Sequence, residues 1–347
     1  GLHDVETMRE IESAVHAINP NAIIYGEGWT METTVTKPGY TMATQLNSTE
    51  TPDFAYFSDT IRDALRGSVF EATQPGFMVG ATGKDERIAK CLQAISEAEV
   101  DGSIVIWSTN PSQTVNYASC HDNYTLFDKL AMSILGMTNP NKTKLDLFAA
   151  LGEEKLSNVI KQDKLAAAYI FLAQGTPFIN GGQEFLRTKK GNPDSYAADT
   201  KGGITWTNTA GILNIDDVNT IDLSMKKTYS DVYNTYKGLI ALRKANPESF
   251  GSNEDAIAER VLVNADTTTK QKLVTRYATG DFLIFFNAGD TDYSVVDGDT
   301  LKVADYPNLI DVSSGEVSSS LLSASNLIDL ETGKLNIPSK SFVILKK

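Results

Sequence analysis

The sequence predicts an α/β fold, namely the second half of a (β/α)8 TIM barrel, followed by an all-β sandwich domain. Four short apolar runs, each accompanied by a helical pattern, lie before residue 250, and repeated strand-then-helix units are typical of a parallel sheet with helices outside. Beyond that point, alternating runs separated by Gly, Asp, Asn and Ser turns indicate antiparallel strands. A closed barrel needs eight strands, so four correspond to half of one. We expect one domain at residues 1–250 and another at 251–347.

The first unit begins with a helix, because Leu2, Val5 and Met8 start an apolar repeat of three or four residues that continues to Ile18. A short run rich in β-branched residues, 22–25, follows as a buried strand. The second unit has a strand at 54–57 and a helix at 58–66. Further helices are expected at 85–98, 126–135, 144–151, 164–174 and 229–244, strands at 114–118 and 176–179, and β runs at 260–263, 273–277, 282–286 and 341–345.

Composition and charge narrow the functional classes. The 347 residues contain 31 Lys and Arg against 44 Asp and Glu, a formal net charge of −13. No stretch gathers basic residues into a stripe that would neutralise phosphates, so we expect no nucleic-acid partner. The apolar runs are shorter than the ~20 residues that cross a bilayer, and no charged-then-apolar leader opens the chain. We therefore expect no membrane partner.

The counts of Cys and His leave catalysis to carboxylates. Cys91 and Cys120 are too few for a disulfide framework and lack the paired spacing of a zinc site. Three histidines leave little room for a metal cluster or a serine–histidine pair. We expect no metal and no cofactor, with calcium binding left open by the sequence. The acidic charge and abundant Ser, Thr and Asn suit a secreted or cell-surface enzyme slightly better than a cytoplasmic one.

Glu27 is the first candidate for chemistry. It stands between Gly26 and Gly28 directly after the predicted strand, where backbone without side chains lets a ligand approach closely. The flat ring of Trp29 beside it could stack on a sugar. The structural alternative is a turn glutamate next to a core tryptophan.

A second polar cluster, His121-Asp122-Asn123, follows the strand expected at 114–118. An imidazole beside a carboxylate can hydrogen-bond adjacent sugar hydroxyls, while the carboxylate stabilises positive charge developing at the anomeric carbon. The alternative is a helix N-cap made by Asp122 or Asn123. A third cluster contains Glu184 and Arg187, for which we expect a buried ion pair that orients the loop rather than a catalytic role.

Three motifs in this order resemble the type I pullulanases of the alpha-amylase superfamily of glycoside hydrolases. They are Tyr-Gly-Glu-Gly-Trp at 25–29, Asn-Tyr-Ala-Ser-Cys-His-Asp-Asn at 116–123, and Gly-Gln-Glu-Phe-Leu-Arg-Thr-Lys at 182–189. Residues 1–8 are similar to the stretch after the family's nucleophile motif, and 236–244 to its last barrel helix. The resemblance covers residues 1–250, and a β-sandwich like the family's carboxyl-terminal domain would follow.

The resemblance implies retaining hydrolysis of α-1,6 linkages in pullulan, amylopectin and limit dextrins. Glu27 matches the general acid/base, Asp122 the transition-state stabiliser, and His121 a hydroxyl-binding histidine where the bond breaks. The other substrate-binding residues implied are Trp29, at the neighbouring subsite, and Asn192 and Tyr196, in a loop that lines the donor side.

The chain departs from the family pattern in one important respect. A retaining mechanism needs a second carboxylate about 5 Å from the acid/base, and in the family this nucleophile lies a few residues before the position of Gly1. The resemblance thus implies a partner, the amino-terminal half of the same enzyme. A smaller departure is Ile221-Asp222-Leu223, where the family usually has Trp after Ile-Asp.

Two alternatives stay open from the sequence. One is a sibling activity in the superfamily, such as isoamylase, glycogen debranching or branching. The other is a catalytically incomplete fragment that only binds α-glucan. The motifs at 25–29 and 183–189 favour the pullulanase type over the siblings.

Overall fold

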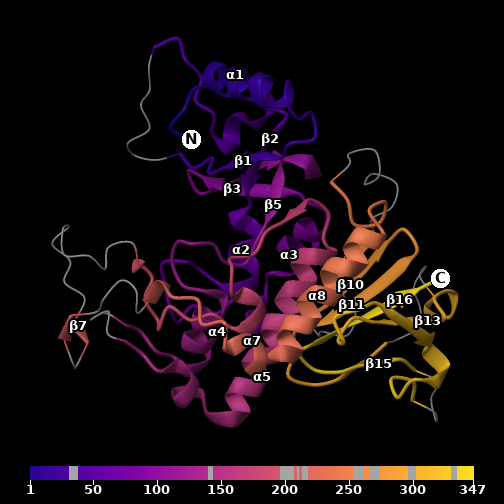
Figure 1. Cartoon of the computed structure of the whole chain (residues 1–347). Coiled ribbons are helices and arrows are strands. Elements are labelled where there is room, and N and C mark those ends of the chain that lie inside the picture. The colour runs from indigo at the N-terminus through magenta and orange to yellow at the C-terminus, as the bar shows by residue number, and fades with distance from the viewer. Residues whose placement is uncertain are drawn as a thin grey trace.

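The computed structural model describes residues 1–30, 38–139, 144–195, 207–208, 211–212, 218–252, 262–265, 273–295, 302–329 and 334–347. In Figure 1 the chain runs from an upper lobe with α1 (Val5–His16) through a layer of helices to β-sheet structure at the carboxyl end. None of the described helices combines the length and apolar character that crossing a bilayer requires. The predicted order, α/β structure followed by β structure, is confirmed.

A four-stranded parallel sheet forms the scaffold of the first part. Its order is β1-β2-β5-β6 and every neighbouring pair is parallel, as the strand-then-helix pattern predicts. The strands are β1 (Ile24–Gly26), β2 (Phe54–Phe57), β5 (Thr114–Asn116) and β6 (Thr176–Pro177). Because they are parallel, their carboxyl ends meet at one edge, so the residues that follow β1 and β5 are brought together.

The helices begin and end at the expected local signals. Asp4 caps α1 by accepting a hydrogen bond from Thr7 N, and Thr125 caps α4 (Leu126–Leu135) by accepting from Asp128 N. Gly136, in the left-handed conformation, ends α4. The remaining described helices are α2 (Asp59–Arg66), α3 (Asp85–Leu92), α5 (Leu147–Leu172), α7 (Met225–Thr228) and α8 (Ser230–Ala245). Short 3₁₀ turns lie at Gln45–Glu50, Phe77–Val79, Pro111–Gln113, Gln183–Phe185, Val303–Asp305 and Leu322–Ala324.

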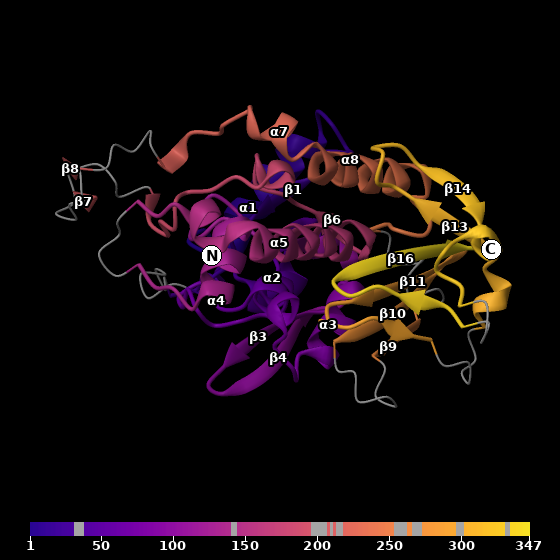
Figure 2. The ribbon, with the colours of Figure 1, turned by 90° about the horizontal axis from the view of Figure 1, so that it is seen from below.

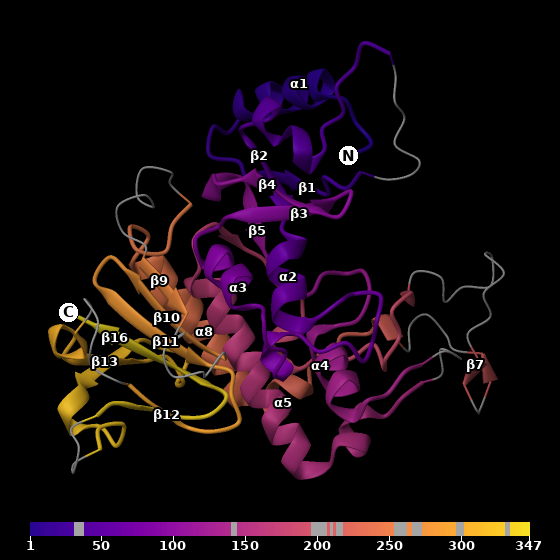
Figure 3. The same ribbon diagram turned by 180° about the vertical axis from the view of Figure 1, so that it is seen from behind.

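Two local predictions differ from the structure. The helix expected over 85–98 ends at Leu92, and a hairpin of β3 (Ser96–Val100) and β4 (Ser103–Ser108) follows, lying between the upper lobe and α2 in Figure 3. Asp101 and Gly102 at its turn have φ of 49° and 76°, the backbone that an Asp-Gly pair favours. The helices expected at 144–151 and 164–174 are parts of α5, which is interrupted at Gly152 with φ 63°.

An antiparallel sheet of order β14-β13-β16-β11-β10-β9 occupies the carboxyl-terminal part. The β runs predicted at 273–277, 282–286 and 341–345 fall on three of its strands, and the run predicted at 260–263 reaches a fourth at residues 262–263, its first two residues lying outside the described ones. The strands of this sheet are β9 (Leu262–Ala265), β10 (Val274–Thr279), β11 (Phe282–Asn287), β13 (Asn308–Asp311), β14 (Ser318–Leu321) and β16 (Ser341–Lys346). Two further pairs are separate from it: β12 (Tyr293–Ser294) pairs with β15 (Asn336–Ile337), and, earlier in the chain, β7 (Thr207–Asn208) pairs with β8 (Gly211–Ile212).

One hydrophobic core joins the helices to this sheet. Figure 2 shows α5 and α8 side by side next to the sheet. Tyr169 of α5 stacks on Phe286 with ring centroids 4.0 Å apart, and its hydroxyl lies 2.9 Å from Thr275 Oγ1. The opposite face of the sheet covers a second core that includes Leu283 and Phe285. The sheet is therefore covered on both faces.

Candidate active site

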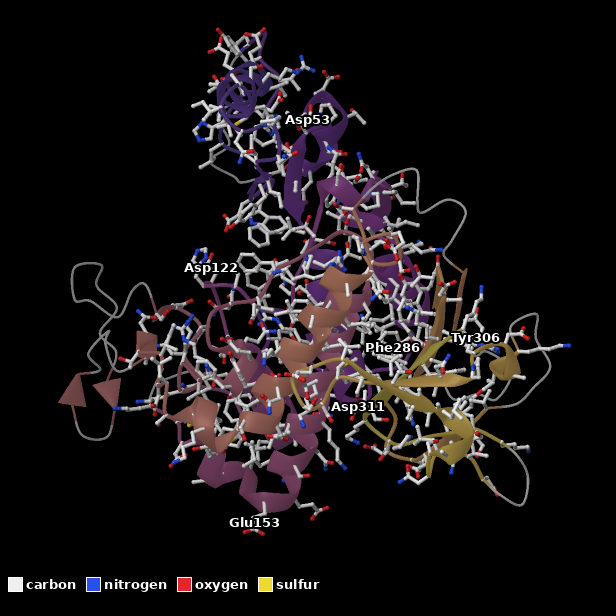
Figure 4. The ribbon with its side chains drawn as sticks, turned by 45° about the vertical axis from the view of Figure 1, so that its right-hand side comes forward. Asp53, Asp122, Glu153, Phe286, Tyr306 and Asp311 are labelled. Atoms are coloured by element: carbon white, nitrogen blue, oxygen red, sulfur yellow. The ribbon has the colours of Figure 1, made fainter. Side chains whose placement is uncertain are left out.

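Glu27, His121 and Asp122 converge at the carboxyl edge of the parallel sheet. One ligating atom from each lies within 4.8 Å of the others. Glu27 is exposed, and the side chains of His121 and Asp122 are 76% and 48% exposed, with His121 Nε2 3.6 Å from Asp122 Oδ1. In Figure 4, Asp122 lies where the upper lobe meets the body, remote from Glu153 and from Asp311. Two residues predicted as catalytic and one as substrate-binding thus share one solvent-facing site.

The backbone around Glu27 is fixed by packing on one side and open on the other. A Cβ added at Gly28 would lie 2.5 Å from the Tyr56 ring and 2.9 Å from Gln45 N, whereas one at Gly26 would meet nothing within 4 Å. Gln45 holds the backbone at Gly28 in place, since its N donates to Gly28 O and its Nε2 donates to Phe57 O, both at 2.8 Å. Of these two glycines, Gly26 is therefore the one that leaves room for a ligand near the main chain.

Trp29 lies half-buried beside an arginine. The Arg62 guanidinium is 5.9 Å from the Trp29 ring centroid and 5.6 Å from that of Tyr117, to whose hydroxyl it donates at 2.8 Å. The same guanidinium pairs with Asp63. Trp29 packs partly against the aromatic cluster of Phe57, Tyr117 and Phe178 beneath the site. This arrangement fixes the indole from below and leaves part of it accessible to a sugar.

A buried polar layer supports the His121-Asp122-Asn123 loop. Lys189 is 1% exposed, and its Nζ donates to His121 O and Asn123 O at 2.9 and 2.7 Å. Burial lowers the pKa of Lys189 to about 8, although the negative charges of Asp128 and Asp122 oppose this. Burial likewise raises the pKa of Asp128, against hydrogen bonds from Thr188, Lys189 and Gly191.

The other predicted site residues differ in their placement. Asn192 is 1% exposed, its Oδ1 accepts from Asp194 N at 2.8 Å, and its Nδ2 has no hydrogen-bond partner among the residues that the structure describes. Tyr196 lies outside the described residues. Substrate binding by either residue stays a prediction.

The expected ion pair between Glu184 and Arg187 does not form. Arg187 donates instead to Gly181 O and Asn219 O, at 3.2 and 2.9 Å, while Glu184 Oε2 accepts from Gly182 N at 2.9 Å. Both charged groups therefore bond to the main chain instead of to each other, Glu184 within its own turn and Arg187 partly to the distant Asn219. The prediction that an ion pair between these two residues orients the loop is therefore wrong.

The site offers two carboxylates and one imidazole. In the described part of the chain, no other group of three such side chains comes close enough to share an ion, and this donor set suits a cation such as Zn²⁺. Without a metal, a carboxylic acid can protonate a leaving oxygen while a second carboxylate stabilises a developing cation. The sequence reasoning missed Gln45 and Arg62, which lie outside the three motifs, and it missed the supporting role of Lys189, the last residue of the motif at 182–189.

The curated proteins to which this chain is similar include several pullulanases. No family model matches the chain. The chain is 30% identical over 247 residues to a pullulanase of Bacillus subtilis (strain 168), covering 71% of this chain and 29% of the relative. It is 32% identical over 197 residues to pullulanase A of Streptococcus pneumoniae serotype 2, covering 56% and 14%. The chain thus spans less than a third of these curated relatives.

Solved structures agree over nearly the whole chain. A Paenibacillus barengoltzii pullulanase, in complex with maltohexaose and alpha-cyclodextrin, matches with a TM-score of 0.72 at 25% identity, over 99% of this chain and 46% of that one. A pullulanase from Bacillus acidopullulyticus matches with a TM-score of 0.69 at 26% identity, over 99% and 36%. The resemblance read from the motifs is confirmed, and the chain belongs with the carboxyl-terminal region of the type I pullulanases.

Proposed function

We propose that this chain carries the acid/base part of a debranching glycosidase that hydrolyses α-1,6-glucosidic linkages with retention of configuration. The observation that supports this most directly is the convergence of the Glu27 and Asp122 carboxylates with His121 at the end of a parallel sheet. Of the two carboxyl groups that flank the bond in a retaining glycosidase, Glu27 would supply the acid/base, and Asp122 would be an additional carboxylate that stabilises the developing positive charge. The kinship with pullulanases favours the α-1,6 bond over other linkages.

The proposed roles follow from exposure and position. Glu27 protonates the leaving oxygen and then activates water, and Asp122 stabilises the developing charge at the anomeric carbon. His121 hydrogen-bonds the hydroxyls of the sugar that is cleaved, and Trp29 forms a wall of the neighbouring subsite. Asn192 and Tyr196 would belong to the donor side.

The fold supports a proposal about the rest of the enzyme. Within the described residues β1 and β6 are the two outer strands of the parallel sheet, and apolar side chains beside β1 are exposed, with Ile23 at 67% and Tyr25 at 49%. Four further strands would cover them and close a (β/α)8 barrel. We propose that residues 1–250 form half of that barrel and 251–347 a β-sandwich domain, with the nucleophile on a preceding segment.

The proposed substrates are pullulan, amylopectin and limit dextrins. The Paenibacillus barengoltzii structure holds maltohexaose and alpha-cyclodextrin, which favours an α-glucan for the related site here. Isoamylase-type or glycogen-debranching specificity is the alternative within the superfamily, and the relative rates on pullulan and glycogen separate the two. A chain that only binds α-glucan would show saturable dextrin binding without turnover.

Glu27→Gln tests the proposed role, in the full chain as its gene encodes it. The amide cannot donate and then remove the proton, so kcat on pullulan should fall by at least about 100-fold while dextrin binding persists. Glu153→Gln is the matched control, because Glu153 is exposed on α5 and remote from the site. A loss below about tenfold for Glu27→Gln would refute the acid/base assignment.

A further inference from the structure

The loop that carries Asp122 is held by a buried cation from another part of the chain. Lys189 follows the 3₁₀ turn Gln183–Phe185, yet its Nζ donates to the carbonyls of His121 and Asn123. These are the two residues that flank Asp122. Asn123 has a φ of 59°, a conformation uncommon outside glycine that needs support from its surroundings.

The backbone of Lys189 is itself anchored to the helix that follows the loop. Asp128, fully buried in the first turn of α4, accepts hydrogen bonds from Lys189 N at 2.7 Å, from Gly191 N at 3.3 Å and from the Thr188 hydroxyl. Asp128 therefore fixes the position from which the Lys189 side chain reaches back to the loop. The loop is held between β5 and α4 by contacts that do not involve the Asp122 side chain.

A second contact holds the other end of the loop. Ser119 Oγ donates to Gln183 Oε1 at 2.7 Å, and Gln183 Nε2 donates to the Tyr236 hydroxyl at 3.0 Å. The segment 183–189 thus holds both the residue two positions before His121 and the carbonyls on either side of Asp122. Burying an ammonium group is costly unless it is paired, so an inaccessible lysine with carbonyl partners at this place indicates a specific task.

We propose that Lys189 is a positioning residue that fixes the main chain on both sides of Asp122 and so aims this carboxylate at the reacting sugar. This inference rests on the proposed function of Asp122. The lysine acts through the backbone, since among the described residues both acceptors of its ammonium group are main-chain carbonyls. It leaves the carboxylate itself 48% exposed and accessible to a ligand.

Lys189→Met tests the proposal, and Lys129→Met is the matched control. Lys129 is also buried, donates to the carbonyls of Glu71, Ala72 and Gln74, and has its pKa lowered to about 8 by burial. Both substitutions remove a buried cation with carbonyl acceptors, but only Lys189 contacts the Asp122 loop. Lys189→Met should lower kcat on pullulan by about 10–100-fold with KM changed less than about threefold, and Lys129→Met should change neither beyond about threefold.

Hydrogen exchange measured by mass spectrometry tests the contact without any activity. Removing the two hydrogen bonds should speed exchange in the peptide covering 119–125 for Lys189→Met and leave it unchanged for Lys129→Met. Lys189→Gln keeps an N–H donor on a shorter side chain and should give intermediate values in both assays. This second variant keeps the proposal testable if Lys189→Met does not fold.

The pH profile adds a readout that a loss of stability would not change. Because burial lowers the pKa of Lys189 to about 8, its two charge-assisted hydrogen bonds should weaken above this pH. Above this pH, kcat should therefore fall more steeply in the unaltered enzyme than in Lys189→Met, although both lose the general-acid proton at alkaline pH. Equal kinetics for the two methionine variants, or unchanged exchange at 119–125, would overturn the proposal. An unaltered enzyme that never cleaves pullulan would instead refute the proposed function.

Discussion

At the scale of single residues, the two carboxylates of the candidate site are exposed to solvent while their main chain is fixed. Glu27 is exposed, and its loop is held by Gln45 and by the packing of Gly28 on Tyr56. Asp122 is half-exposed, and its loop is held by Lys189. The structure of both loops therefore depends on contacts made by neighbouring residues, and the two carboxylate side chains contribute little to it. Substitutions at these two positions should change chemistry far more than stability.

Asp122→Asn applies this argument. The amide keeps the shape but loses the negative charge that would stabilise an oxocarbenium-like transition state, so kcat on pullulan should fall by at least about 100-fold. The dissociation constant for maltotriose, measured by calorimetry, should change less than about fivefold, because ground-state binding depends less on that charge. Asp53→Asn, at an exposed position in the upper lobe, is the control. An unchanged kcat would show that Asp122 does not act on the transition state.

Sequence reasoning could find the chemistry-bearing residues but not the residues that hold them. Glu27, His121 and Asp122 follow apolar runs in a strand-then-helix order, and parallel strands bring such positions to one edge. Lys189 gave no comparable signal, since lysines are usually exposed and its acceptors lie 66 and 68 residues away along the chain. The pairing expected for Glu184 and Arg187 failed because sequence spacing does not report competing carbonyls.

At the scale of elements, a hydrogen-bonded chain connects α5, α8 and the site loop. The Tyr236 hydroxyl of α8 donates to Asp163 Oδ1 of α5 at 2.8 Å, and Gln183 links Tyr236 to Ser119. Asp163 is fully buried, and within the described part of the chain its Oδ2 has no hydrogen-bond partner. Burial raises the pKa of Asp163 to about 7, against the opposing effects of Tyr236 and Lys164. An ionised Asp163 therefore costs stability where the helices meet.

Asp163→Asn should stabilise the protein in a pH-dependent way. Because folding raises this pKa from 3.8 to about 7, stability from the protonated form is complete below 3.8 and is lost as pH rises through about 7. Asparagine stays neutral and keeps an oxygen for Tyr236. Relative to the unaltered protein, its melting temperature should rise by a few degrees at about pH 8 and by less than half as much at about pH 5, where only part of the window between 3.8 and about 7 has been crossed.

The control for this comparison is Asp281→Asn, at an exposed carboxylate in the turn between β10 and β11. Thermal unfolding of the three proteins at both pH values measures the effect. A shift of equal size at both pH values would mean that ionisation of Asp163 does not affect stability.

Element boundaries were predictable where a strong local signal stood alone. The helix expected at 229–244 is α8, and Asp4 and Thr125 cap their helices as their side chains favour. The β3–β4 hairpin was missed although Asp101-Gly102 is a strong turn signal. The helix predicted over 85–98 is too long, since α3 ends at Leu92. Apolar periodicity does not mark where a helix ends when no Pro or Gly follows directly.

At the scale of the whole molecule, the division expected at residue 250 does not interrupt the core. Tyr169 and Tyr236 belong to the same buried cluster as Tyr277, Phe286 and Ile344 of the carboxyl-terminal sheet. The sequence held a sign of this in Phe282-Leu283-Ile284-Phe285-Phe286, a continuous apolar run that indicates a strand covered on both faces. Which helices cover it could not be read from the run, because contact partners depend on the tertiary arrangement.

Polar contacts reinforce the same junction. Gln174 Nε2, just after α5, donates to Ser249 O at 2.8 Å and to the Tyr277 hydroxyl at 2.9 Å. Arg243 Nη1 of α8 donates to the carbonyls of Phe171 and Ala173. Burial lowers the pKa of Arg243 to about 10, so this contact is made by a desolvated cation. The helices and the sheet should therefore lose their structure together.

Phe286→Ala tests whether the two parts unfold as one unit. The ring is fully buried and stacks on Tyr169 across the junction, so its removal should cost about 3–5 kcal/mol in the free energy of unfolding. Phe70→Ala makes the same change at a ring that is 87% exposed and should leave stability within about 0.5 kcal/mol. Because the core is shared, calorimetry should show a single transition displaced to lower temperature in Phe286→Ala. Two separated transitions, with only the smaller one displaced, would show that the sheet unfolds independently of the helices that cover it.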